Sequence, residues 1–150
     1  MTLQNLLRIG RLKQHAATAD EVQRLLAAID RNLADAAVST ISDETRFDAA
    51  YKAVMQCALV GMLAAGFRPS STEPGHHQTM IQSLPLTLGA ENDVWVVLDA
   101  LRRQRNANDY TGQPITPAAS AECIAQAKAL RKRLRKHLET VHPDLLKTPQ

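Results

Sequence analysis

The stretch that decides the fold is SDETRFDAAYKAVMQCALVGMLAAGFRP, residues 42–69. A hydroxyl at Ser42 and the two carboxylates after it can cap free backbone amides and suit the positive end of a helix. Gly66 and Pro69 end the pattern, because glycine allows a left-handed turn and proline cannot continue a helix. Between these ends, apolar side chains recur at three- and four-residue steps, which predicts a long helix with one buried face. The positions on this face are Phe47, Ala50, Tyr51, Val54, Ala58 and Met62.

Composition agrees with a helical protein. The chain has 150 residues, enough for one domain with a real core and too few for two ordinary domains. Aromatic residues make up only 3%, whereas β-sheets prefer aromatic and β-branched side chains. Six glycines and seven prolines are too few for a loop-rich chain, and 45% apolar residues are too many for a disordered one.

Five further helices are predicted around this one. A short one covers residues 3–10, and a longer one follows the capping-box spacing of Thr18 and Glu21. A short helix over 76–84 is closed by Pro85, and a long one runs over about 91–106. Its segment 94–98 resembles a buried strand by residue type, but no second strand is predicted that could pair with it.

The last predicted helix opens at Thr116 and Pro117. The sequence therefore predicts an all-α fold, an up-down antiparallel bundle of four long helices plus one or two short ones. We expect a single helical domain over residues 1–150, with its core at about 20–140. The apolar seam of the last helix is predicted at Ile124, Ala127, Leu130, Leu134, Leu138 and Val141.

Cysteine usage and hydropathy favour a cytoplasmic protein with no membrane partner. The longest uninterrupted apolar run, residues 57–67, is about half of the ~20 residues that a membrane span needs. No cleavable apolar segment stands at the start of the chain. Cys57 and Cys123 both fall inside helical patterns, so we expect them to be reduced core residues.

Basic residues are concentrated in one part of the chain. Residues 101–137 hold nine of the 18 Lys and Arg residues but only two of the 15 acidic ones. This imbalance predicts a phosphate-bearing or acidic partner. Three interpretations of the densest run, 128–136, stay open: a solvated outer face, a surface that binds RNA or DNA phosphates, or a contact with an acidic protein. The candidate phosphate-binding residues are Arg102, Arg103, Lys128, Arg131, Lys132, Arg135 and Lys136.

A second candidate site lies at the end of the 91–106 helix. Arg105, Asn106, Asp109 and Tyr110 stand close together there, and the first three are spaced to share one side of the helix end. An arginine in this position can hold a phosphate or stabilise the charge of a phosphoryl transition state. The alternative is that arginine simply suits the negative end of a helix, and that the Asn-Asp-Tyr-Thr-Gly sequence makes the turn.

The adjacent histidines His76 and His77 form the third candidate. Neighbouring helical residues point about 100° apart, so the pair does not suit one metal ion. Packing or capping is the first interpretation of these side chains; the alternative for one of them is to line a cleft beside Arg105. No metal and no cofactor is predicted. The chain lacks a glycine-rich phosphate loop, a Ser/His/Asp or Cys/His nucleophile arrangement and a paired-carboxylate site, which argues against hydrolases, kinases and dehydrogenases.

Three motifs in this order resemble the HEPN family (higher eukaryotes and prokaryotes nucleotide-binding). They are RFDAAYKAV (46–54) followed by LAAGFRP (63–69), then GHH (75–77), then RNANDY (105–110). The resemblance covers about residues 20–140 and implies a helical bundle.

In HEPN ribonucleases an Arg, a polar residue after it and a His four to six residues on form the catalytic motif, usually in a cleft between two protomers. The resemblance places Arg105 and Asn106 as the first two, and Tyr110 stands where the His is expected. Branches with an Arg-Asn-x-x-Asp-Tyr helix end resemble accessory or partner-binding members. A tyrosine, with an ordinary pKa of about 10, is a poor general base at neutral pH.

The sequence therefore predicts a HEPN-like module that binds RNA, a nucleotide or a protein partner. The resemblance implies a homodimer and permits a role in a bacterial toxin–antitoxin or defence system, with a small nucleotidyltransferase as partner. The alternative function is a metal-independent endoribonuclease. In it Arg105 would stabilise the phosphorane, Asn106 would orient the substrate, and Tyr110 or a His of the 75–77 segment would transfer the proton. Whether the chain is an enzyme stays open.

Overall fold

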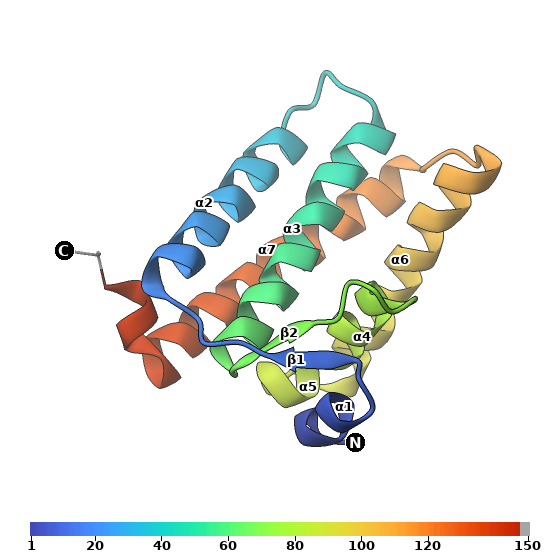
Figure 1. Cartoon of the computed structure of the whole chain (residues 1–150). Helices are drawn as coiled ribbons and strands as arrows, with labels where there is room; N and C mark the ends of the chain where they lie inside the picture. The colour runs from blue at the N-terminus through green and yellow to red at the C-terminus, as the bar shows by residue number, and fades with distance from the viewer. Residues whose placement is uncertain (148–150) are drawn as a thin grey trace.

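The computed structural model describes residues 1–147; the last three residues of the predicted domain lie outside the described part. Four long helices form the body of the molecule (Figure 1). They are α2 (Ala19–Ala36), α3 (Asp43–Ala64), α6 (Asn92–Thr111) and α7 (Pro117–Val141). The shorter elements are α1 (Leu3–Arg8), α4 (His76–Gln82), α5 (Leu84–Thr87) and a closing 3₁₀ turn, η1 (Pro143–Leu146). The predicted all-α bundle is confirmed.

Local capping sets the helix starts as the sequence predicts. The hydroxyl oxygens of Thr18, Ser42 and Thr116 each accept a hydrogen bond from the backbone N–H three residues on. Each bond satisfies one of the free amides of a helix start. The capping box at Thr18 is only half formed, because the Glu21 carboxylate accepts from His15 Nε2 at 2.8 Å.

The core is built around α3. All six apolar side chains predicted for its buried face are buried, and α3 packs between α2 and α7. The seam of α7 is buried from Ile124 to Leu138, but Val141 is 55% exposed, so its placement in the seam is wrong. Val141 is the last residue of α7. Cys57 and Cys123 are buried and free, as predicted.

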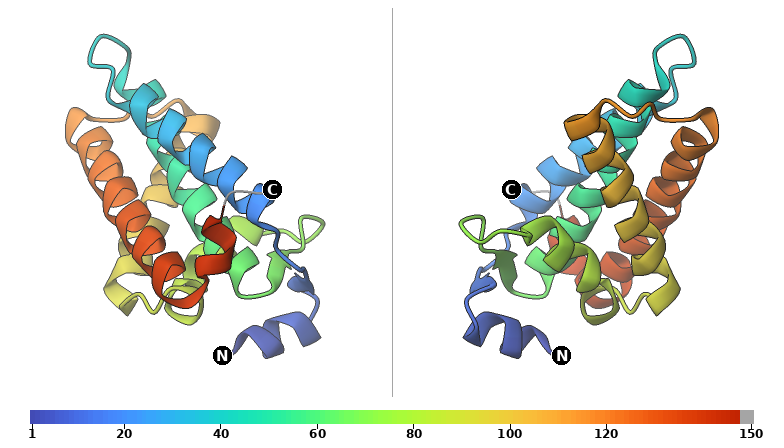
Figure 2. Two further views of the ribbon diagram at one scale, coloured as in Figure 1. Left: turned by 90° about the vertical axis from the view of Figure 1, so that its left-hand side faces the viewer. Right: turned by 90° about the vertical axis from the view of Figure 1, so that its right-hand side faces the viewer.

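A two-stranded antiparallel ribbon was not predicted. β1 (Leu12–Gln14) pairs with β2 (Phe67–Pro69), with Lys13 opposite Arg68. Gly66, at φ 97°, turns the chain out of α3 and into β2. Figure 2 shows α1 at the end of the bundle away from the α2–α3 loop, held there through β1. Leu6 and Leu12 are buried, so the packed core extends ahead of residue 20.

Two predicted helix ends differ from the structure. α6 continues past Asn106 to Thr111, where Gly112 takes the left-handed conformation that ends helices. The Arg105–Tyr110 segment is therefore helical, not a turn. Pro85 does not close the helical region either, since it stands in the first turn of α5, where the missing N–H costs no hydrogen bond.

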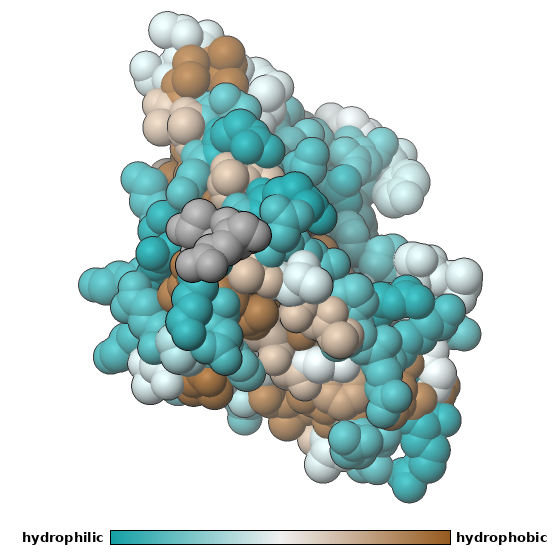
Figure 3. All heavy atoms as spheres, turned by 60° about the vertical axis from the view of Figure 1, so that its left-hand side comes forward, coloured by the Kyte–Doolittle hydropathy of each residue, from teal (hydrophilic) through white to brown (hydrophobic). Residues whose placement is uncertain are grey.

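Exposed apolar side chains gather at one tip of the molecule. Val38 and Ile41 lie in the loop between α2 and α3, at 43% and 38% exposure. Figure 3 shows hydrophobic atoms at the upper end of the molecule, where this loop lies. The tip borders a groove of about 440 Å³ that is lined by the end of α2, this loop and the first half of α3.

Candidate functional site

A pocket of about 610 Å³ opens between α3, α4 and the second half of α6. We call it the α3–α6 pocket. Its polar lining comes from Asp48, Tyr51, Lys52, Gln56, Ser71, His76, His77 and Arg105, and its apolar lining from Met55, Leu59, Pro69 and Met80. The structure thus brings together Arg105 and both candidate histidines, which are almost 30 residues apart in the chain.

Arg105 lies on the face of Tyr51. The guanidinium carbon is 5.0 Å from the centre of the Tyr51 ring, a cation–π arrangement. Arg105 Nε is 3.8 Å from the nearer Asp109 oxygen, one turn on along α6, which is too long for a hydrogen bond. Arg105 therefore has a fixed position, while its N–H donors stay available to a ligand.

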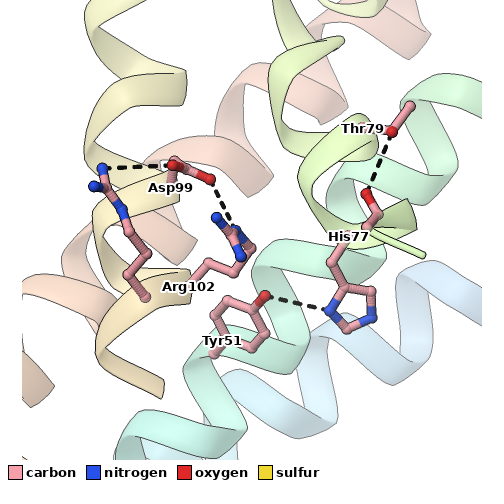
Figure 4. Close-up of polar contacts among 7 residues, drawn as sticks. Tyr51, His77, Thr79, Asp99 and Arg102 are labelled. Carbon is pink, nitrogen blue, oxygen red and sulfur yellow. Dashed lines mark hydrogen bonds and ion pairs between the residues drawn. The ribbon is translucent and has the colours of Figure 1, made fainter. Parts of the chain in front are cut away.

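His77 and Tyr51 meet inside the pocket (Figure 4). The Tyr51 hydroxyl is 3.4 Å from His77 Nδ1, and the ring of His76 stands edge-on to His77 with 4.7 Å between ring centres. Burial raises the pKa of Tyr51 to about 12, although Arg105 and Arg102 act against this rise. Burial also lowers the pKa of His77, and His76, Arg105 and Arg102 lower it further. At neutral pH, His77 is thus a neutral imidazole and Tyr51 a neutral phenol.

Asp99 holds Arg102 near this pair. Its carboxylate is buried and accepts a hydrogen bond from Arg102 Nε at 2.8 Å (Figure 4). Arg103 Nη2 approaches the other Asp99 oxygen at 3.5 Å, but its side chain is 67% exposed and does not line the pocket. Of the two predicted phosphate-binding arginines on α6, only Arg102 therefore adds positive charge near Tyr51 and His77.

Sequence reasoning missed Asp48, Lys52 and the role of Tyr51. Asp48 and Lys52 are one turn apart on α3 and line both the pocket and the neighbouring groove. The pKa of Asp48 is raised by partial burial and by Asp109, while Arg105 lowers it. With Gln56 they form a polar stripe at four-residue steps along an otherwise apolar helix. That spacing is a signal in the sequence of a partly exposed face, which meets α2 at Gln56, where Asn32 Nδ2 donates to Gln56 Oε1 at 2.8 Å.

Asn106 and Tyr110 do not line the pocket. Asn106 follows Arg105 by one residue and so points about 100° away around α6. Tyr110 is 85% exposed near the end of that helix. Within one copy of the chain, only Arg105 and Asp109 of the four candidates at this helix end come together.

The basic residues of α7 are divided between structural ion pairs and free side chains. Arg131 bonds to Asp30 of α2 and Arg135 to Glu139 of its own helix. Lys128, Lys132 and Lys136 are exposed and have no ion pair within residues 1–147. These lysines lie one turn apart on a single stripe, so they are the α7 residues most available to a partner.

Two features are absent from the described residues 1–147. No group of three His, Cys, Asp or Glu side chains there is arranged to hold a metal ion. No helix in the same part of the chain is both long enough and apolar enough to cross a membrane.

No family model, curated protein or solved structure matches this chain. The resemblance to the HEPN family therefore stays a prediction that depends on its three motifs. The groups that line the α3–α6 pocket are the features of the molecule that bear on its function.

Proposed function

We propose that the chain is a HEPN-like module that binds a phosphate-bearing ligand, RNA or a nucleotide, in the α3–α6 pocket. The observation that carries this proposal is the position of Arg105, which lies over the Tyr51 ring at the pocket and meets its ion-pair partner Asp109 only at 3.8 Å, too far for a hydrogen bond. An arginine with free N–H donors in a fixed fork suits the oxygens of a phosphate group. Lys52, on α3, adds a second cation to the lining.

The size and lining of the pocket support a ligand with both a charged and an apolar part. Its volume of about 610 Å³ lies within the range of ~300–1,000 Å³ typical of small-molecule sites. Met55, Leu59 and Met80 give it an apolar wall that could cover a base or a ribose. The carboxylates of Asp48 and Asp109 both lie near Arg105, so a bound phosphate would compete with them for the guanidinium.

Binding of labelled single-stranded RNA, followed by fluorescence anisotropy with EDTA present, tests the proposal, and unlabelled nucleotides serve as competitors. We expect Arg105→Ala to weaken binding by about tenfold or more, the value of a charge-assisted hydrogen bond. Arg103→Ala is the matched control, because it removes the same charge from an exposed position outside the pocket. Equal losses in the two variants would show that only net charge matters and would contradict the proposal.

A second candidate function is metal-independent RNA cleavage, favoured by the place of His77 in the same pocket as Arg105. His77, neutral at pH 7, would accept the proton of a ribose 2′-hydroxyl as this oxygen attacks the adjacent phosphorus. The bond to the 5′-oxygen then breaks, and water supplies the proton that this leaving oxygen needs. Arg105 would stabilise the negative charge of the phosphorane. Tyr51, whose pKa is raised to about 12, keeps its proton at neutral pH and so cannot act as the base.

Cleavage of a labelled RNA by tag-free protein separates the two functions. For a ribonuclease we expect cleavage that survives EDTA, leaves 2′,3′-cyclic phosphate ends, and disappears in both Arg105→Ala and His77→Gln. Tyr110→Phe should retain activity, because Tyr110 lies outside the pocket. If wild type binds RNA but leaves it intact, the chain is a binding module without this activity.

We also infer a homodimer, as the resemblance implies, formed across the open side of α3. The pocket continues through Asp48 and Lys52 into a groove of about 440 Å³ that ends at Val38 and Ile41. Light scattering tests this. Ile41→Asp should yield a monomer, whereas Val96→Asp, an exposed apolar position on α6, should not. A monomeric wild type would refute the dimer, and mixing with a small nucleotidyltransferase tests the other predicted partner.

A further inference from the structure

A second hollow lies along α7, on the side that faces α5 and the start of α6. We call it the α7 groove; its volume is about 590 Å³, and it shares no residue with the α3–α6 pocket. Its floor is apolar and includes Leu88, Val94, Leu130 and Val141. Val141 is the α7 residue whose predicted place in the core is wrong, and at 55% exposure it leaves apolar surface uncovered here.

The rim of the α7 groove is positive. Lys132 and Lys136 stand one turn apart on it, are exposed, and form no ion pair within residues 1–147. Arg133 also lines the groove, but Glu91 binds its guanidinium at 2.7 Å. No acidic side chain is part of the lining. A complementary occupant therefore carries negative charge at its edges and an apolar surface between them.

The shape of the groove favours a helix over a small molecule. Its α7 lining runs from Gln126 to Val141, which is about four helical turns or ~22 Å. A bound helix of about 15 residues would follow that length. The lining holds no Phe, Tyr or Trp, so nucleic-acid bases would find no aromatic ring on which to stack.

We propose that the α7 groove binds an acidic amphipathic helix of a partner protein. Apolar side chains of that helix, at three- and four-residue steps, would cover Leu88, Val94 and Val141, as in other helix-in-groove interactions. Its Glu or Asp residues would pair with Lys132 and Lys136. This contact is independent of the ligand proposed for the α3–α6 pocket.

The test uses a fluorescein-labelled peptide of about 15 residues, helical by design, with leucines along one face and glutamates on both sides of it. Anisotropy compares this peptide with a scrambled peptide of the same composition. We expect the designed peptide to bind wild type more tightly, and Lys132→Glu with Lys136→Glu to weaken binding by about tenfold, since two attractive rim pairs become repulsive. Val141→Asp should weaken it through the apolar floor.

Lys128→Glu is the control, because Lys128 is exposed on the same helix but does not line the groove. A peptide with lysines in place of the glutamates should bind the variant that carries both Lys132→Glu and Lys136→Glu better than it binds wild type. The proposal fails if the scrambled peptide binds equally well, if Lys128→Glu has the same effect as the double variant, or if no binding is found. It also fails if single-stranded RNA displaces the peptide and the binding of that RNA depends on Lys132 and Lys136. This surface would then be an RNA contact.

Discussion

Replacing Arg105 by alanine should separate binding from stability. In the folded protein Arg105 has two partners, the Tyr51 ring at 5.0 Å and the Asp109 carboxylate at 3.8 Å. A cation–π contact near the surface contributes about 0.5–1 kcal/mol. The side chains of Arg105 and Asp109 are each more than a third exposed, so after solvent screening their ion pair adds only a few tenths of a kcal/mol. Alanine recovers about 0.2 kcal/mol through its higher helix propensity.

The expected loss of unfolding free energy is therefore within about 1 kcal/mol, or a shift of roughly 2–4 °C in Tm. Loss of a bidentate contact with phosphate should cost about 1.5–3 kcal/mol of binding free energy, which is about 10- to 150-fold in affinity. Urea unfolding followed by circular dichroism gives the first quantity, and RNA anisotropy gives the second. Arg105→Lys keeps the charge but loses the planar fork, so its affinity should fall between wild type and alanine.

Asp99→Ala, on the same helix, provides the contrast. Asp99 is buried, and its removal leaves the half-buried Arg102 without its carboxylate, at a cost of about 1–3 kcal/mol. An Arg105→Ala variant that loses as much stability as Asp99→Ala would show that Arg105 is a structural residue. The assignment of the pocket as a binding site would then lose its central observation.

Three other predictions concern pH, packing and salt. Folding lowers the pKa of His77 below 6.5, its ordinary value, so the folded state binds fewer protons than the unfolded state, and the free energy of unfolding should fall as the pH drops through 6.5. Urea unfolding at pH 7 and pH 5 measures this fall, and His77→Gln should reduce it. A Cβ at Gly61 would lie 3.0 Å from a Leu88 methyl carbon, so Gly61→Val should destabilise the protein by about 1–3 kcal/mol, and Leu88→Ala should relieve part of that effect in a double-mutant cycle. RNA affinity should fall steeply between 50 and about 200 mM salt, and salt-insensitive binding would mean that arginine and lysine contacts with phosphate do not dominate.

The parts of the fold that depend on local sequence were predictable. Caps at Ser42 and Thr116, the apolar face of α3 and most of the α7 seam are encoded within a few turns of chain, and the structure confirms them. The β1–β2 ribbon was missed because it pairs residues 12–14 with 67–69, two three-residue segments with no alternating pattern. Such short strands form only because tertiary packing brings them together.

In the candidate site too, features encoded locally were predictable, and contacts between distant residues were not. Arg105 stood out by residue type at the end of a helix, whereas only the fold shows that both histidines of the 75–77 segment line the same pocket. Tyr51 was expected only to pack in the core, because helical periodicity predicts burial and not what the hydroxyl faces. The pairing of Arg131 with Asp30 spans 101 residues, so spacing along α7 could not show which basic residues are already occupied.

The position of α3 at the centre of the bundle has a consequence for how the molecule opens. Amides of α3 lie between α2 and α7, so we expect them to exchange with solvent deuterium only when the whole protein unfolds. The last ten residues of α6 contain no buried side chain, and in Figure 1 this half of the helix stands away from α3, so its amides should exchange by local fraying. Tyr51 and Arg105 thus join the slowest-exchanging helix to one of the fastest. A ligand held by both would slow exchange along residues 102–111 and would identify its own binding site without any mutation.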